Sequence, residues 1–307
     1  HPRVRMTTSE WLQALVPLVA DLPQELPEAE RYRRLLASAA QAEPVTVKSS
    51  SITDFHRLSS SEDFGPLLWR GGLTLTSDAK QFGGFSGLVL SPDCGSLLAV
   101  SDGGQWLQGR LQYQDGRLSA FGSATMMPLL DSMGQPLPGK NVGDAEAVAK
   151  LRNGRLAVAF ERLIRFGSYD GVTGRFKPIP HPKDIDTGPR NGAVEALGQL
   201  SDGSFIAIGE DHHDGNSNIR GWIWKGSHTT LFAIPQFGDY RVTDLAVMND
   251  DTVLTLERRF ENASLPGMAV RRFPASGLKN GAVVKPELLL EATTPLHVID
   301  NMEGIAL

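Results

Sequence analysis

Residues 194–211 read VEALGQLSDGSFIAIGED, and this stretch decides the fold. Two apolar runs flank Asp202-Gly203, a dipeptide typical of a tight β-hairpin turn. Glu195 stands at the start of the first run, and Glu210 stands at the end of the second. The stretch therefore predicts a two-stranded hairpin that carries a carboxylate at each open end.

The same pattern recurs along the chain. Segments that align with it are FSGLVLSPDCGSLLAVSD (85–102), AEAVAKLRNGRLAVAFER (145–162), TDLAVMNDDTVLTLER (243–258) and MEGIAL (302–307). The anchor positions are Ser86, Glu146, Glu195, Asp244 and Glu303, at intervals of 60, 49, 49 and 59 residues. A period of about 50 residues, with several short strands per unit and no convincing helix after residue 65, indicates an all-β propeller rather than a parallel α/β fold.

Counting outward from the expected turns places acidic residues opposite one another. In this count Asn153-Gly154, Asp202-Gly203 and Asp250-Asp251 are two-residue turns. The resulting pairs are Glu146 with Glu161, Glu195 with Glu210, Asp244 with Glu257 and, with a single acid, Ser86 with Asp102. Because the first strand of each propeller blade lines the central channel, these acids are expected to gather at one mouth of the channel.

Facing carboxylates repel, so such a site either stays protonated or binds a cation. Oxygen ligands without cysteine favour a hard ion, so we expect Ca²⁺ or another divalent metal. The expected metal ligands are Glu146, Glu161, Glu195, Glu210, Asp244, Glu257, Glu303 and Asp102. The alternative is that these acids cap strand ends and pair with Arg162, Arg258 and Arg259.

Composition excludes several classes of function. The net charge is −5 and there is no run of Lys or Arg, which argues against nucleic acid or anionic lipid as the main partner. No apolar stretch approaches the roughly 20 residues that a membrane span requires. The single cysteine, Cys94, excludes an intrachain disulfide framework and a cysteine-based zinc cluster. The oligomeric state stays open.

Residues 1–44 differ in pattern from the rest of the chain. They show helical spacing, and Thr7 and Glu10 are placed as in a capping box. The run ASAAQA before Glu43 is similar to an export cleavage site, although the charged EAERYRRLL before it is not an apolar signal region. We expect a helical or export-related segment over residues 1–44 and a propeller domain over residues 45–307.

The repeats resemble one family in particular. The stretches FGGFSGLVLSPDCGSLLAVSDGGQWLQGRL, GDAEAVAKLRNGRLAVAFER, GAVEALGQLSDGSFIAIGED, YRVTDLAVMNDDTVLTLERRF and VIDNMEGIAL resemble, in order, the phytase-like propellers with "esterase-like activity of phytase". The resemblance covers residues 65–307. It implies a six-bladed propeller in an exported bacterial protein, periplasmic or secreted, that hydrolyses phosphoric or carboxylic esters. The more distant β-propeller phytases use Ca²⁺ to bind phosphate.

Two departures from the family pattern stand out. SDGGQW lacks a charged residue expected near Gly104 or Gln105. Family members also continue beyond Leu307, so the resemblance implies a six-bladed propeller that is incomplete at its C-terminus, with about five blades visible in the repeat. Glu303 would then lack its opposite acid.

These observations predict a calcium-dependent ester hydrolase acting on a small anionic substrate. Arg162, Arg258 and His212 are the expected substrate-binding residues. Ser86 is not expected to be a nucleophile, because GFSGL lacks the final glycine of G-x-S-x-G. Two alternatives stay open: a lactonase-type propeller acting on neutral cyclic esters with an Asn ligand, and a non-catalytic propeller that calcium stabilises.

Overall fold

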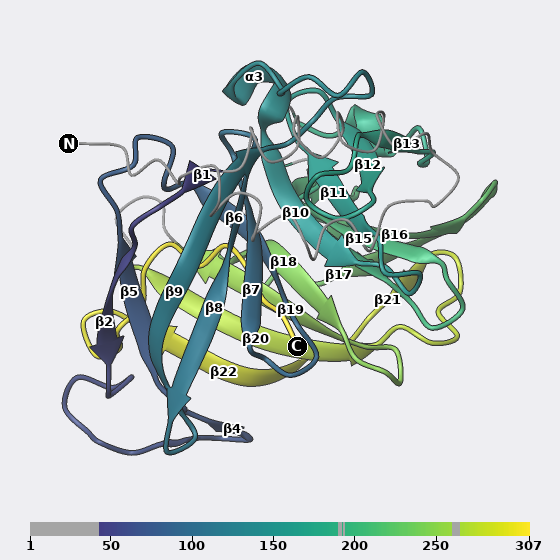
Figure 1. Cartoon of the computed structure of the whole chain (residues 1–307). Coiled ribbons are helices and arrows are strands. Elements are labelled where there is room, and N and C mark those ends of the chain that lie inside the picture. Colours follow the sequence, from purple (N-terminus) through teal and green to yellow (C-terminus); the bar gives the residue numbers. More distant parts are fainter. Residues whose placement is uncertain (1–42, 190–191, 193, 260–264) are drawn as a thin grey trace.

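A computed structural model describes residues 43–189, 192, 194–259 and 265–307 of the chain. In these residues, four β-sheets of four or five strands are arranged around a common centre in the manner of a β-propeller (Figure 1). Neighbouring strands in the sheets are antiparallel, except that β21 runs parallel to β17. The prediction of an all-β propeller is therefore confirmed in its general form.

Each blade is a meander whose first strand lies nearest the centre. The first blade contains β6 (Phe85–Leu90), β7 (Ser96–Ser101), β8 (Gln105–Gln114) and β9 (Arg117–Pro128), with β1 (Glu43–Pro44) at its outer edge. The second contains β10 (Ala145–Lys150), β11 (Leu156–Phe160), β12 (Arg165–Tyr169) and β13 (Lys177–Ile179). The third contains β14 (Ala196–Gln199), β15 (Phe205–His213), β16 (Ile219–Lys225) and β17 (His228–Ile234), with β21 (Ala282–Val283) at its outer edge. The fourth contains β18 (Arg241–Val247), β19 (Thr252–Arg259), β20 (Gly267–Pro274) and β22 (Glu287–Thr293).

Smaller elements decorate the blades. Two-stranded sheets are formed by β2 (Lys48–Ile52) with β5 (Gly72–Thr76) and by β3 (Asp63–Phe64) with β4 (Leu67–Leu68). A short helix, α3 (Lys140–Gly143), precedes β10, and a 3₁₀ turn covers Ile185–Thr187. Helix α3 lies at the end of the molecule where β10 begins (Figure 1).

Adjacent blades pack face to face through large apolar side chains. Trp106 of the first blade and Tyr169 of the second are fully buried, with ring centroids 5.6 Å apart. Between the third and fourth blades, the ring centroids of Phe232 and Phe273 are 5.9 Å apart. Burial of such apolar surface between the blades stabilises the ring.

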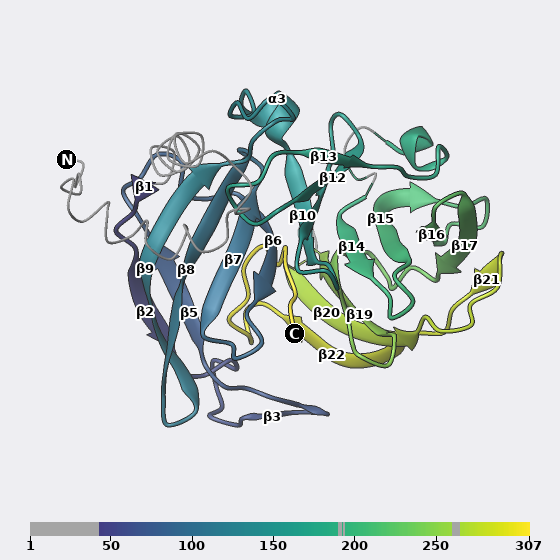
Figure 2. The same ribbon diagram turned by 45° about the vertical axis from the view of Figure 1, so that its right-hand side comes forward.

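The inner strands approach closely at a glycine. A Cβ atom added to Gly87 of β6 would lie 2.7 Å from the backbone nitrogen of Val148 in β10. The facing residue, Ala147, is also small and fully buried. This contact brings β6 beside β10, with β14 next around the ring (Figure 2).

The number of blades differs from the expected six. The residues that the structure describes form four blades, and residues 302–307 form no strand. This segment lies between β18 and β6. The hydroxyl of Thr243 donates to the carbonyl of Met302 at 2.8 Å, the backbone N–H of Ile305 donates to Asp244 at 2.9 Å, and Gly304 packs against Leu88. The backbone groups of this segment therefore pair with side chains of β18 and not with the backbone of β18. A regular strand would need backbone-to-backbone hydrogen bonds.

The register predicted from two-residue turns was wrong by one residue. Leu151 donates its N–H to the carbonyl of Arg155, so the loop has three residues, and Gly154 ends it at φ +81°. A type I turn followed by a left-handed residue gives this loop length. Gly203 and Asp251 occupy the same position in the third and fourth blades, at φ +87° and +63°. The extra loop residue shifts every pair, so the expected facing acids do not lie directly opposite each other.

Bulges in the inner strands shift the register again. In the second blade Ala147 faces Ala159, but Ala145 faces Phe160, which leaves Glu146 as the extra residue. The first blade has the same irregularity at Ser86, and the fourth has it at Thr243. A bulge re-aims the side chain that it carries. The two shifts together determine which acids meet at the channel.

The helices expected within residues 1–44 lie outside the described residues, except for Glu43 and Pro44, which form strand β1. Among the described residues, no helix has the length and apolar character needed to cross a membrane.

Candidate functional site

A cavity of about 570 Å³ opens at the end of the channel where the inner strands begin. Residues from all four blades, from α3 and from the C-terminal segment line it. Its acidic lining residues are Asp102, Asp144, Glu146, Glu161, Glu195, Glu210, Asp300 and Glu303. Its basic lining residues are Lys140, Arg162, Arg241 and Arg258. Acids outnumber bases two to one, so the cavity attracts cations.

Six of the eight expected metal ligands line this cavity. They are Asp102, Glu146, Glu161, Glu195, Glu210 and Glu303. Two of the three expected substrate-binding residues, Arg162 and Arg258, line it as well. The structure therefore brings together most of the residues that the repeat singled out, although their partners differ from the predicted ones.

The tightest group of carboxylates contains Asp144, Glu146 and Glu161. Each residue offers one oxygen atom, and these atoms lie within 4.8 Å of one another. The bulge at Glu146 explains this geometry. Glu161 donates its N–H to the carbonyl of Asp144, so Asp144, not Glu146, lies opposite Glu161 across the two strands. The side chain of the bulged Glu146 then lies beside these two carboxylates. We call these three residues the Asp144 group.

The charge state of this group is strongly perturbed. Burial, together with the nearby carboxylates of Asp144 and Glu161, raises the pKa of Glu146 to about 8, against a hydrogen bond with Ser86 that lowers it. Burial also raises the pKa of Glu161, and the backbone N–H of Gly192 opposes this shift by donating to its carboxylate. Ionised carboxylates at these positions thus favour a nearby positive charge.

The donor set of the Asp144 group fits a hard divalent cation. Calcium holds oxygen ligands at about 2.3–2.6 Å, so two of its ligands are at most about 5 Å apart. Asp144 is only 2% exposed, and its buried Oδ1 atom has no hydrogen-bond partner among the described residues, the ammonium of Lys140 being 3.8 Å away. Its other oxygen, Oδ2, accepts from Nε of Arg162 at 2.6 Å. A buried carboxylate oxygen without a hydrogen bond costs free energy, and a cation in direct contact with Oδ1 would offset that cost.

A second group of carboxylates surrounds Arg258. Its guanidinium contacts Glu303 and Asn301 through Nη1 and lies 3.3 Å from Glu210 through Nη2. Glu195 is the third carboxylate near this arginine, and it is only 8% exposed. We call Glu195, Glu210 and Glu303 the Glu195 group. Here the positive charge comes from the protein itself.

Asp102 and Lys140 form a third feature at the rim of the cavity. The ammonium of Lys140 lies 2.5 Å from Asp102 and 3.8 Å from Asp144. Gly84 permits this position of Asp102, because a Cβ on Gly84 would lie 2.2 Å from a carboxylate oxygen of Asp102. Lys140 thus hydrogen-bonds to Asp102, whereas its distance to Oδ1 of Asp144 is too long for a hydrogen bond.

Three expected site residues lie away from the cavity lining. Glu257 is fully buried between β19 and β20, where Arg271 donates to it at 2.7 Å. Asp244 faces the C-terminal segment and accepts from the N–H of Ile305. His212 is buried with its ring centroid 5.1 Å from that of Trp222. The shifted register of the fourth blade turns Asp244 and Glu257 away from the mouth, because Glu257 faces Val242 and Asp244 faces Leu256.

Sequence reasoning missed Asp144 and Lys140. Asp144 stands two residues before the anchor Glu146 in GDAEAV, and only the bulge brings it opposite Glu161. The pattern Asp144-Ala145-Glu146, with an acid on each side of a small residue, is the sequence feature that could have pointed to Asp144. Lys140 lies in a connection with no counterpart in the other repeats, so no pattern pointed to it.

Residues 80–307 match the phytase-like family, described as "Esterase-like activity of phytase". The chain belongs to this family. The match spans strands β6 to β22, which form all four blades except the edge strand β1, and every residue of the Asp144 and Glu195 groups. No curated protein matches the sequence.

Several solved structures share a distant likeness with this phytase-like chain. U3-55K is 11% identical, with 74% of this chain and 86% of that chain covered and a TM-score of 0.38. A catalytically inactive virginiamycin B lyase from Staphylococcus aureus is 11% identical, with 85% and 78% covered and a TM-score of 0.37. A streptogramin B lyase is 10% identical, with 78% and 72% covered and a TM-score of 0.34. Likenesses this distant say nothing about the activity of this chain.

Proposed function

We propose that this protein is a calcium-dependent hydrolase of small anionic esters, most directly phosphate esters, with its site at the acidic mouth of the channel. The observation that carries the proposal is the Asp144 group, in which three carboxylate oxygens lie within 4.8 Å and Oδ1 of Asp144 accepts no hydrogen bond from the described residues. Family membership supports ester hydrolysis as the reaction class.

The chemistry of the lining selects the metal. The described residues that line the cavity include neither cysteine nor histidine, so the protein donors they offer are carboxylate, amide, hydroxyl and backbone oxygens. Such oxygen donors suit Ca²⁺ better than softer transition metals. Asp144, Glu146 and Glu161 would hold the ion, and when bound it would supply positive charge and Lewis acidity to an ester oxygen.

The basic residues at the rim then orient the substrate. The side chain of Arg162 is 42% exposed. Its Nε donates to Asp144 and its Nη1 donates to Asn141 at 3.0 Å, so the rest of the guanidinium group faces the opening of the cavity. Lys140 is 49% exposed at the same rim. Guanidinium and ammonium groups bind phosphate oxygens well, and here they stand beside the ion-binding carboxylates. An anionic ester is thereby favoured over a neutral one.

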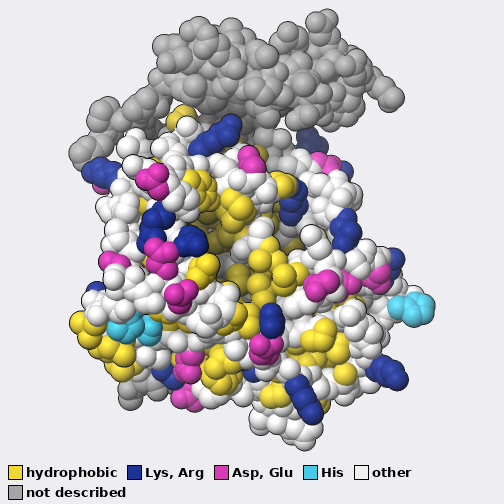
Figure 3. Space-filling model, turned by 90° about the horizontal axis from the view of Figure 1, so that it is seen from below, with side chains coloured by type: hydrophobic (Ala, Val, Ile, Leu, Met, Phe, Trp, Pro, Cys, Tyr) yellow, Lys and Arg dark blue, Asp and Glu magenta, His cyan; other side chains and the backbone are white. Residues whose placement is uncertain are grey.

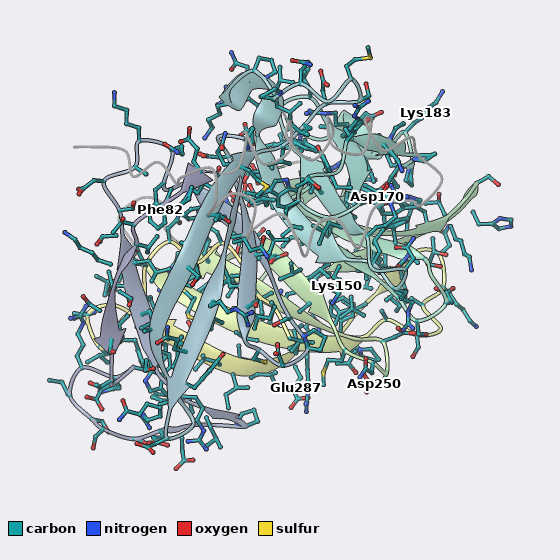
Figure 4. The ribbon with its side chains drawn as sticks, viewed as in Figure 1. Phe82, Lys150, Asp170, Lys183, Asp250 and Glu287 are labelled. Atoms are coloured by element: carbon teal, nitrogen blue, oxygen red, sulfur yellow. The ribbon has the colours of Figure 1, made fainter. Side chains whose placement is uncertain are left out.

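The test combines calcium binding with turnover. Wild type, Asp144→Asn and the control Asp250→Asn would be assayed with p-nitrophenyl phosphate, p-nitrophenyl acetate, phytate and a neutral lactone, in calcium and in EDTA. Asp250 lies exposed in the turn after β18, outside the residues that line the cavity (Figure 4). We expect phosphate-ester turnover that EDTA and Asp144→Asn abolish and Asp250→Asn leaves unchanged.

Other outcomes identify the competing functions. Turnover of the lactone alone would indicate a lactonase-type enzyme, for which Asn301 beside Glu303 would be an amide ligand. Absence of any turnover, together with a calcium-dependent rise in melting temperature, would indicate a non-catalytic propeller that calcium stabilises. Phosphate-ester turnover that survives both EDTA and Asp144→Asn would show the proposal to be wrong.

A further inference from the structure

The Glu195 group is built like a cation site that already holds a cation. Its three carboxylates come from three places in the ring: Glu195 precedes β14, Glu210 belongs to β15, and Glu303 belongs to the C-terminal segment. Arg258 reaches them from β19. Three acids from separate elements that converge on one point are typical of an ion site, and here a guanidinium group occupies that point.

One carboxylate of this group lacks a specific partner. Glu195 is more than nine-tenths buried and lines the cavity. It makes no hydrogen bond or ion pair with any residue that the structure describes, in contrast to Glu210 and Glu303, which both contact Arg258. Burial raises the pKa of Glu195, the neighbouring Glu210 raises it further, and Arg258 lowers it. Arg258 therefore forms ion pairs with only two of the three carboxylates of the group.

The arginine is held by charge. Burial alone would lower the pKa of the Arg258 guanidinium, but Glu303, Glu195 and Glu210 raise it above its ordinary value. A guanidinium group stays protonated at all physiological pH values and offers several donors in one plane, so it can neutralise two carboxylates at once. When all three acids are ionised, this single positive charge leaves the Glu195 group with an excess of negative charge.

We propose, resting on the proposed function, that Arg258 is a built-in cation that fills a second divalent-metal site formed by Glu195, Glu210 and Glu303. The cavity then takes its metal ion at the Asp144 group alone. Arg258 thus sets the number of ions that the cavity binds, and it is a specificity-determining residue rather than a direct substrate ligand.

The contrast between the two groups supports this division. In the Asp144 group, Arg162 contacts Oδ2 of Asp144 from one side, whereas Oδ1 accepts no hydrogen bond from the described residues and has only the more distant ammonium of Lys140, at 3.8 Å. In the Glu195 group, Arg258 lies among the acids and contacts two of them directly. One group therefore has room in its coordination sphere for an ion, and the other has its central position taken by the arginine.

Isothermal titration of the EDTA-treated protein with Ca²⁺ tests the proposal by counting ions. The variants are wild type, Arg258→Gln and the matched control Arg272→Gln, which removes an exposed Arg–Glu pair on β20 of the same blade. We expect Arg258→Gln to bind one more ion than wild type and Arg272→Gln to match wild type. Adding Glu195→Gln to Arg258→Gln should remove the extra ion.

Each remaining outcome decides the question. An equal ion count in Arg258→Gln and wild type, or an extra ion that Glu195→Gln does not remove, would overturn the proposal. Should Arg258→Gln fail to fold, Glu195→Gln in the wild-type background still tests it. That variant should keep the wild-type ion count, whereas loss of the bound ion would contradict the division into two groups. A wild type that binds no calcium would refute the proposed function but not this inference, if Arg258→Gln then gains one ion.

Discussion

The carboxylate of Glu161, in the second blade, accepts a hydrogen bond from the backbone N–H of Gly192, which precedes the inner strand of the third blade. This contact joins two blades through a member of the Asp144 group. Gly192 has φ +90°, and a Cβ atom added to it would lie 2.8 Å from Oε2 of Glu210 and 2.9 Å from Cβ of Asp211. The glycine therefore lets one backbone segment pass between Glu161 and Glu210, which belong to different carboxylate groups.

We expect Gly192→Ala to destabilise the protein and to weaken calcium binding. The matched control is Gly154→Ala, since Gly154 also has positive φ but has nothing within 4 Å of its added Cβ. Both variants pay the backbone cost, so their difference isolates the clash with Glu210 and Asp211, for which overpacking costs of about 1–3 kcal/mol are typical. Urea unfolding measures the difference. Equal destabilisation by the two substitutions would show that the close approach at Gly192 is unimportant.

The metal-free protein should lose stability as the pH rises. The pKa of Glu146 is raised from 4.5 to about 8 in the folded protein, so its contribution is fully present below pH 4.5 and is lost as pH rises through about 8. Burial shifts the pKa values of Glu161 and Glu303 in the same direction. Melting temperatures measured in EDTA between pH 5 and pH 9 should therefore fall, and less steeply for Glu146→Gln. A melting temperature that rises over this range would contradict the assignment.

Calcium binding near pH 7 should release protons. Since the pKa of Glu146 is about 8 without metal, this carboxyl is mostly protonated at pH 7 and must lose its proton when it becomes a ligand. Titration calorimetry in buffers with different ionisation enthalpies measures this release. We expect less release at pH 9 and less for Glu146→Gln. The exposed control Glu287→Gln, on β22, should behave as wild type (Figure 4).

The repeat in the sequence predicted the propeller and most of the cavity lining, because both depend on hairpins that recur at a fixed spacing. It did not predict which acids meet. Pairing across a hairpin depends on the length of its loop. The loops that end at the left-handed residues Gly154 and Asp251 have three residues, but their sequences also fit a two-residue turn, so the sequence did not show which length forms. The bulge at Glu146 is equally silent in sequence, yet it creates the Asp144 group. The family resemblance predicted six blades because it compares sequence motifs. Residues 302–307 carry such a motif, but they do not form the backbone hydrogen bonds with a neighbouring strand that would make them a strand.

The channel also has a second end whose character repeat counting did not predict. A cavity of about 530 Å³ lies where the inner strands finish, lined largely by apolar residues and backbone of β6, β10, β14, β18 and residues 305–307. Seen from below, hydrophobic side chains surround a central hollow of the molecule (Figure 3). Of the two cavities, only the one where the inner strands begin is therefore lined by carboxylates of the described residues.

The ion pair of Glu257 and Arg271 should support stability and leave metal binding unchanged. Glu257 is 0% exposed, and the hydroxyl of Thr255 also donates to it at 2.8 Å. Arg271→Met would leave this carboxylate buried without its cation, for which a cost of about 3–5 kcal/mol is typical. Replacing both partners by apolar residues should recover much of that loss. Urea unfolding measures the stability, and calcium titration of Glu257→Gln should give the wild-type ion count. Loss of a bound calcium ion in Glu257→Gln would show that Glu257 is a metal ligand after all.

Asp244 should anchor the C-terminal segment to the fourth blade. Its two oxygens accept from the N–H groups of Leu245, at 2.8 Å, and Ile305, at 2.9 Å, and the side chain is almost fully buried. In Asp244→Asn one carboxylate oxygen becomes an amide donor, so one of the two N–H groups loses its acceptor, at a typical cost of about 1–3 kcal/mol. Hydrogen exchange followed by mass spectrometry should show faster exchange in the peptide that contains Ile305. Asp250→Asn, which alters a turn cap on the same blade, should leave that peptide unchanged. Unchanged exchange in Asp244→Asn would mean that the packing of Met302 and Ile305 against the fourth blade holds the segment instead.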